Sequence, residues 1–176
     1  MDSLLRRTGW DARDVAQPWA EIEAALGTEL PNDFKLLCQA FGAGEFSQEM
    51  SVLCADETRV LDLVTTRRSL LESDNSSDGP FAPYRIYEPG TTGGLIPWGS
   101  SASGDWFFWQ VTGGAVDAWP VLTMQVDTWE WNRFEMTAAE LLYRILTEPG
   151  FWPPSAAQAV CGPVAQAMPE PFFEPA

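Results

Sequence analysis

The side chains that most enzymes use for proton transfer, nucleophilic attack or metal binding are missing from this sequence or lack the necessary spacing. There is no histidine, which excludes Ser-His-Asp and Cys-His nucleophile systems, zinc-protease motifs and any histidine general base. The 25 acidic residues form no D-x-D-x-D-G calcium loop, and the adjacent Asp56 and Glu57 are expected to point in different directions. The sequence therefore predicts no catalytic residue, no metal site and no other cofactor.

Phosphate binding and glycoside hydrolysis have no specific signal either. The glycine-rich run at 90–94, GTTGG, lacks both a P-loop lysine and dinucleotide-binding spacing, and Lys35 is the only lysine. A glycosidase needs two carboxylates at a set separation in a cleft, and a chain with 25 acids can supply many pairs by chance. These glycines are expected to form turns, and most of the acids to be solvated.

The three cysteines, Cys38, Cys54 and Cys161, are never closer than sixteen residues. An odd number at this spacing argues against a disulfide framework and against a CxxC metal or redox site. We expect reduced, mostly buried thiols.

The net charge of −15 limits the possible partners. A surface this acidic repels nucleic acid and attracts a basic protein, although solubility alone would also account for it. No export signal and no apolar run of about 18 residues is present, so no membrane contact is expected and the predicted location is cytoplasmic. The oligomeric state is not encoded in any recognisable pattern.

Six tryptophans in the second half could stack on sugars or bases, or could fill a packed sheet, and the packed sheet is favoured. They are Trp98, Trp106, Trp109, Trp119, Trp129 and Trp131. The stretch 95–109, LIPWGSSASGDWFFW, predicts a hairpin of a strand at 95–98, a loop at 99–104 and a strand at 105–111. Both faces of the second strand are apolar, as in a central strand covered by helices on one side and by a loop or partner on the other.

Four helices are predicted to position this sheet. One runs from Pro18 to Gly27 and a second from Pro31 to Gly42, each beginning at a proline and ending at a glycine. A third lies within 58–72. Thr137 and Glu140 form a capping box at the start of the last helix, which buries Leu141, Leu142, Ile145 and Leu146.

Two of these helices have defined inner faces. In the second helix the inner face comprises Phe34, Leu37, Cys38 and Phe41. In the third it comprises Leu61, Val64 and Leu71, with Arg67 and Arg68 on the rim.

The other segments are predicted strands, a loop and a tail. Residues 50–53 form a strand, 115–126 a strand that Pro120 places at an edge or bulge, and 128–134 a strand or an aromatic loop. Residues 72–94 are a long loop with a short extended piece at 84–87. The tail is proline-rich and extended, and could pack through Phe151 and Trp152.

An ordered set of short motifs resembles the SUKH superfamily, immunity-type proteins related to fungal cell-wall synthesis regulators. The motifs are W-x-x-I-E-x-x-L-G at 19–27, L-P-x-D-F-K at 30–35, F-G-x-G-x-F at 41–46, P-W-G at 97–99, G-D-W-x-x-W at 104–109 and W-P-V at 119–121. The resemblance covers residues 15–146. It implies an α+β fold with helices packed on a mixed, mostly antiparallel sheet.

The resemblance also implies a domain organisation and a function. A SUKH-like domain would span residues 1–147 with the long loop at 72–94, followed by a proline-rich tail at 148–176. The protein would be a bacterial immunity protein that binds and neutralises a cognate toxin, of a nuclease type, and would not be an enzyme. The motif residues would be mainly structural: Trp19, Leu26, Gly27, Pro31, Phe34, Phe41, Gly42, Trp98, Gly99, Gly104 and Trp109.

Acidic residues are the candidate contacts for a basic toxin. They are Glu45, Glu49, Asp56, Glu57, Asp74 and Asp78, with Asp105 as a further candidate that either caps its own turn or points to the partner. The alternative function is an intracellular regulatory or scaffold module of the same fold that binds another protein. A third hypothesis, a carbohydrate-binding or hydrolytic domain that uses the tryptophans, ranks last.

Overall fold

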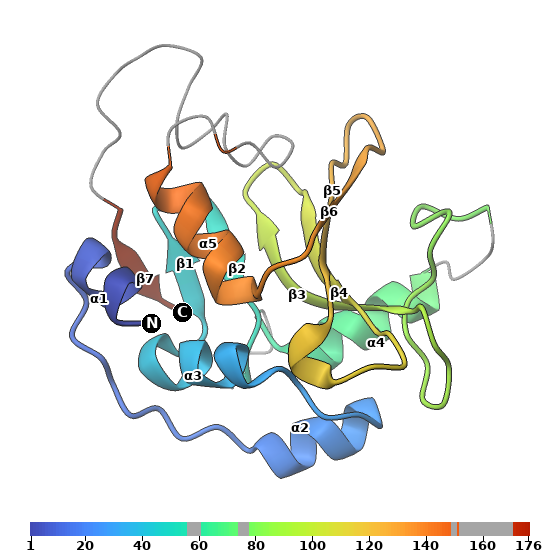
Figure 1. Ribbon diagram of the computed structural model, residues 1–176, viewed down its shortest axis with the longest axis horizontal. Coiled ribbons are helices and arrows are strands. Elements are labelled where there is room, and N and C mark those ends of the chain that lie inside the picture. Colours follow the sequence, from blue (N-terminus) through green and yellow to red (C-terminus); the bar gives the residue numbers. More distant parts are fainter. Residues whose placement is uncertain (56–60, 74–77, 149–150, 152–170) are drawn as a thin grey trace.

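The computed structural model describes residues 1–55, 61–73, 78–148, 151 and 171–176, which form helices packed on one sheet (Figure 1). The helices are α1 (Asp2–Thr8), α2 (Trp19–Leu26), α3 (Asn32–Phe41), α4 (Leu63–Ser73) and α5 (Ala138–Thr147), with a short 3-10 helix η1 (Val116–Ala118). The strands are β1 (Gly44–Phe46), β2 (Met50–Val52), β3 (Leu95–Ser101), β4 (Trp106–Gln110), β5 (Val121–Met124), β6 (Trp131–Phe134) and β7 (Phe173–Pro175).

The sheet has the order β6-β5-β4-β3-β2-β1-β7, and each pair of neighbouring strands is antiparallel. Isolated parallel bridges join Cys54 to Asp62 and Ile86 to Leu95. The expected α+β fold with a mostly antiparallel sheet is therefore confirmed.

Helices α2 and α3 form where local sequence signals predicted them. Their C-caps, Gly27 and Gly42, have positive φ angles of 72° and 83°, which glycine adopts without strain, and Gly27 is in the left-handed helical conformation. The predicted inner face of α3 is fully buried. In α5 the Thr137 side chain accepts a hydrogen bond from the Glu140 N–H, so the capping interaction is confirmed from its Thr side.

The central strand β4 is buried on both faces, as its aromatic pattern predicted. Phe107 and Trp109 belong to the larger core, to which α1, α2, α3 and α5 contribute. Phe108 belongs to a second cluster with Phe81, against which Leu70 and Leu71 of α4 also pack. Figure 1 shows α5 in front of the sheet and α4 behind it.

The predicted hairpin is present, but its first strand is longer than expected and its second, β4, is shorter than the predicted 105–111. Strand β3 continues to Ser101, so that a tight turn replaces the expected loop at 99–104. A register shift between Pro97 and Gly99 bends the strand. A Cβ on Gly99 would lie 2.7 Å from the carbonyl oxygen of Ser51, so the close approach of β2 requires a glycine there.

The sheet is also larger than expected. Strand β5 lies between β4 and β6, so the edge position suggested by Pro120 is wrong; this proline comes just before the strand. Residues 131–134 form the edge strand β6. Strand β7 comes from the region predicted to be a tail, and α1 and β1 were not anticipated. Phe151 packs against Phe134, and Trp152 lies outside the described residues.

The face predicted for the third helix is only partly correct. Leu61, Val64 and Leu71 pack against the core clusters as expected, but Arg67 is buried rather than on the rim. Leu63 and Arg67 are the buried residues of α4, whereas Leu61, Val64 and Leu71 are half-buried. The Arg67 guanidinium donates to the Tyr87 carbonyl through Nε at 3.0 Å and also through Nη2. A charged side chain can lie on an inner face when a buried acceptor is available.

The buried position of Arg67 also perturbs its ionisation. Burial lowers the pKa of the guanidinium, and the nearby Glu88 carboxylate opposes this shift.

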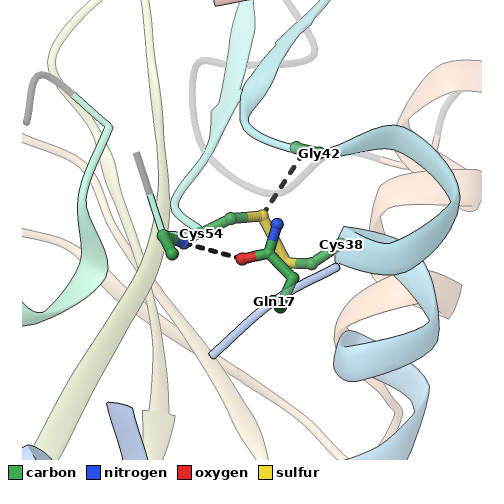
Figure 2. The surroundings of a disulfide bond; sticks show 5 residues. Gln17, Cys38, Gly42 and Cys54 are labelled. Carbon is green, nitrogen blue, oxygen red and sulfur yellow. Dashed lines mark hydrogen bonds between the residues drawn. A yellow bond between two sulfur atoms is a disulfide. The ribbon is translucent and has the colours of Figure 1, made fainter. Parts of the chain in front are cut away.

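The cysteine prediction was half right. Cys38 and Cys54 are buried as expected, but they form a disulfide rather than two free thiols. The Cα atoms of the two cysteines lie 6.1 Å apart, because α3 packs beside the segment after β2. The spacing of the cysteines in the sequence does not reveal this proximity. Figure 2 shows the disulfide beside the Gly42 carbonyl, with the Ala55 N–H donating to Gln17 Oε1 at 3.0 Å. Cys161 lies outside the described residues.

Candidate functional site

Three hairpin turns emerge together at one end of the sheet, the upper side of Figure 1. They join β1 to β2 (residues 47–49), β3 to β4 (102–105) and β5 to β6 (125–130). Successive hairpins of an antiparallel sheet place their turns side by side, two strand spacings or about 10 Å apart. We refer to these three turns as the turn end.

Backbone hydrogen bonds join the first turn to both of its neighbours. The Ala102 N–H donates to the Glu49 carbonyl at 2.8 Å, and the Ser47 N–H donates to the Phe172 carbonyl at 2.9 Å. The segment leading into β7 therefore belongs to the same end of the molecule as the turns.

Asp105 joins the second turn to the third. Its carboxylate accepts hydrogen bonds from the Ser101 hydroxyl at 2.8 Å and from the Val126 N–H at 3.1 Å. The Asp105 N–H in turn donates to Ser101 Oγ at 3.1 Å. Burial raises the pKa of this carboxyl group, and the hydrogen bonds from Ser101 and Val126 oppose the shift.

This geometry decides between the two roles expected for Asp105. The residue is only 1% exposed, so its carboxylate caps the turn and offers no surface to a partner. Its inclusion among the contact residues was therefore wrong. The sequence signal is the same for an acid that caps a turn and for an acid that contacts a partner. Only the hydrogen bond from the Val126 N–H in the neighbouring turn identifies Asp105 as a turn cap.

Two carboxylates face each other across β1 and β7 beside the turn end. Glu45 is paired in register with Glu174, a position where side chains of neighbouring strands contact each other. Ser51 Oγ donates to Glu45 Oε1 at 3.2 Å, and Gln48 Nε2 donates to Glu174 Oε2 at 3.1 Å. Within the described ranges, neither carboxylate is in an ion pair.

The pair places two like charges at directly opposite positions on neighbouring strands, where identical charges repel. The neutral donors Ser51 and Gln48 orient the two carboxylates without neutralising them. The Glu45–Glu174 pair is therefore a site of concentrated negative charge that can attract a basic group from outside the molecule.

The other predicted contact acids are not all close to this pair. Glu49 lies in the first turn. Asp78 is exposed at the start of the segment that packs through Phe81 on β4. Strands β1 and β4 are three spacings apart, about 14 Å. Asp56, Glu57 and Asp74 lie outside the described residues.

The predicted contact residues did not include three acids of this region, Glu174, Asp127 and Glu130. Glu174 had no local signal, since its partner strand is far away in the chain. Asp127 and Glu130 flank Trp129 in the third turn. The pattern D-T-W-E, which begins directly after the strand predicted at 115–126, could have indicated an exposed acidic turn.

The positions of the tryptophans disfavour a carbohydrate-binding surface. Trp98, Trp109 and Trp119 are buried, and Trp106 and Trp131 are half-buried. Their rings pack in the core clusters, as Trp98 does on Phe107 with ring centroids 5.4 Å apart.

The described part of the chain contains neither a clustered metal site nor a membrane-spanning helix. No group of three or more potential metal-ligating side chains occurs there. None of its helices is long and apolar enough to cross a membrane.

The fold and the turn end define a small α+β domain. Its distinctive surface feature is the Glu45–Glu174 carboxylate pair, which has no ion-pair partner among the described residues. Residues 16–142 match the sequence model of the SUKH_6 family, described as SMI1-KNR4 cell-wall. The chain belongs to this family, and hence to the SUKH superfamily. Comparisons with curated proteins and with solved structures give no match.

Membership of the family is consistent with a function of the immunity-protein type. SUKH proteins are generally non-catalytic immunity proteins. Several motif residues occupy structural positions in this fold. Phe34, Phe41, Trp98 and Trp109 are buried, Trp19 is half-buried, and Pro31 immediately precedes α3.

Proposed function

We propose that this protein is an immunity protein that binds a cognate toxin and neutralises it by occlusion, the toxin being a basic protein of a nuclease type. The Glu45–Glu174 pair carries the proposal. Two carboxylates held opposite each other, with neutral hydrogen-bond donors and no cation among the described residues, attract basic side chains. The family and the net charge of −15 support the same function.

Neutralisation by occlusion requires only binding. A nuclease holds its substrate in a positively charged cleft, and an acidic protein surface complements such a cleft without any chemical step. Electrostatic attraction also accelerates association at low ionic strength. We propose a cytoplasmic location, which the disulfide does not itself support, because disulfides are rare in the cytosol.

The test is co-expression of this protein with the toxin encoded beside its gene, scored by survival of the host and by gel filtration of the complex. The double variant Glu45→Lys/Glu174→Lys should weaken the complex and reduce protection. The control Asp11→Lys/Glu29→Lys changes the net charge equally at two exposed positions outside the turn end and should retain protection.

Two results would refute the proposal. One is full activity of the toxin with no complex at low salt. The other is equal protection by the Glu45→Lys/Glu174→Lys variant and its control, which would show that the carboxylate pair has no special role.

A further inference from the structure

Large apolar side chains are exposed at two places on the turn end. Four such residues are exposed in the described part of the chain: Met1, Leu36, Trp129 and Phe172. Trp129 is 53% exposed at the third turn, and Phe172 is 41% exposed beside the first turn. A bulky aromatic side chain left in water has no role in the core and is typical of the centre of a protein interface.

The third turn holds Trp129 in a defined position. Its backbone N–H donates to the Gln125 carbonyl at 2.9 Å, and the Gln125 N–H donates to the Glu130 carbonyl at 3.0 Å. The Thr128 hydroxyl donates to Gln125 Oε1 at 3.0 Å. An anchor that is already ordered loses little conformational entropy on binding.

The backbone of Trp129 has φ of 59°, which is unusual for a bulky residue. Glycine would adopt this conformation more easily. The sequence therefore places a tryptophan in water at a position where a smaller residue would favour the turn.

The charges around Trp129 limit what can bind there. Asp127 and Glu130 are exposed on either side of it, and neither is in an ion pair within the described residues. A second copy of this chain would bring like charges together at a net charge of −15, and a nucleic acid would be repelled in the same way. The complementary occupant is a basic protein.

The turn end is also large enough for such a partner. Together with the adjoining β7, the turn end spans six strand spacings from β6 to β7, about 29 Å. A standard interface covers about 800 Å² on each partner, a patch of similar width.

We propose that Trp129 is the apolar anchor of the toxin-binding interface, inserting its indole between basic groups of the partner that contact Asp127 and Glu130. This inference rests on the proposed function, because the basic partner is the toxin. It adds the third turn to the surface formed by Glu45, Glu49 and Glu174. Trp129 thus supplies an apolar contact at one side of this surface, and the carboxylates supply acidic contacts.

The experiment measures the dissociation constant of the purified complex with the neighbouring toxin, made catalytically inactive by substitution. Trp129→Gly removes the indole and suits the positive φ, so the turn should remain folded. We expect it to weaken binding at least tenfold. Leu36→Ala is the matched control, since Leu36 is 54% exposed on α3, and it should change binding less than threefold.

A second pair of variants tests the acidic rim. Asp127→Lys/Glu130→Lys should slow association and reduce its dependence on salt, whereas Trp129→Gly should act mainly on dissociation. Hydrogen exchange should slow at residues 125–130 when the complex forms.

The outcomes separate this inference from the proposed function. If the parent protein binds the toxin and Trp129→Gly binds within threefold of it, the anchor is refuted and the immunity function stands. If the parent protein forms no complex with the toxin, both are refuted. Tenfold or greater loss in Trp129→Gly, with exchange protection at 125–130, supports the inference.

Discussion

Removal of the Asp105 carboxylate should loosen the connection between the second and third turns. In Asp105→Ala the Ser101 hydroxyl and the Val126 N–H both lose their acceptor. Asp105→Asn is the matched control, because its amide oxygen can still accept from Val126.

The expected magnitude follows from these two hydrogen bonds and from burial. Each bond to a carboxylate contributes about 1.5–3 kcal/mol, and the unfavourable burial of the charge offsets part of the sum. We therefore expect Asp105→Ala to lower the free energy of unfolding by about 2–3 kcal/mol. For a chain of this length that corresponds to a fall in Tm of about 4–12 °C. Asp105→Asn should stay within about 1 kcal/mol of the parent.

The raised pKa of Asp105 adds a pH dependence with a defined sign. A carboxyl group that binds its proton more tightly when folded stabilises the protein fully below the unfolded pKa of about 3.9. This contribution is lost as the pH rises through the folded pKa. The stability of Asp105→Asn relative to the parent should therefore increase as the pH rises above about 4 and then level off.

Urea unfolding followed by circular dichroism from pH 4 to pH 8 measures both effects. A difference of less than about 0.5 kcal/mol between Asp105→Ala and the parent would contradict the predicted role of the carboxylate. The same pH dependence in the parent and in Asp105→Asn would contradict the predicted effect of its raised pKa.

The other predictions concern the disulfide, one buried cation and one helix cap. In a Cys161→Ser background, thiol titration in denaturant should find no free thiol before reduction and two after it. Reduction, or the double variant Cys38→Ala/Cys54→Ala, should lower stability by about 3 kcal/mol, since the disulfide closes a loop with a sequence separation of 16. Arg67→Met should lose about 1–3 kcal/mol in urea unfolding, because a buried carbonyl loses its donor, and an unchanged midpoint would contradict this. Thr137→Ala should lose about 1 kcal/mol with little change in the m-value, as expected for the loss of one N-cap.

The parts of the fold that the sequence predicted are those with local physical causes. Helices α2 and α3 follow from a proline before the helix, a glycine after it and apolar residues at helical spacing. The two buried faces of β4 follow from the four consecutive aromatic residues at 106–109, because successive side chains of a strand point to opposite faces. Each of these signals lies within about a dozen residues.

The features that were missed depend on contacts between distant residues. Strands β1 and β7 have three residues each, too few to show alternation. The Cys38–Cys54 disulfide requires knowing how α3 lies against the end of β2. The inward position of Arg67 depends on a carbonyl twenty residues later in the chain.

The candidate site shows the same limit. Glu45 and Glu49 were singled out by charge alone, and the structure brings them to the turn end. The positions of Glu174 and Trp129 at the same end of the sheet follow only from the strand order. Asp105 was also a candidate because of its charge, but it is buried. The sequence alone does not distinguish a buried acid from an exposed one.

Strand β7 has a consequence for synthesis of the protein. Its Phe173 packs with Trp10, Phe41 and Phe46 at ring-centroid distances of 4.9, 5.0 and 4.8 Å. Gln48 and Glu174, which bond across this edge, are 126 residues apart. On the ribosome the aromatic cluster remains incomplete until residue 173 has emerged. Chains in which residue 173 has not yet emerged thus expose aromatic side chains that chaperones and proteases can recognise. Pairing of β7 with β1 covers these side chains.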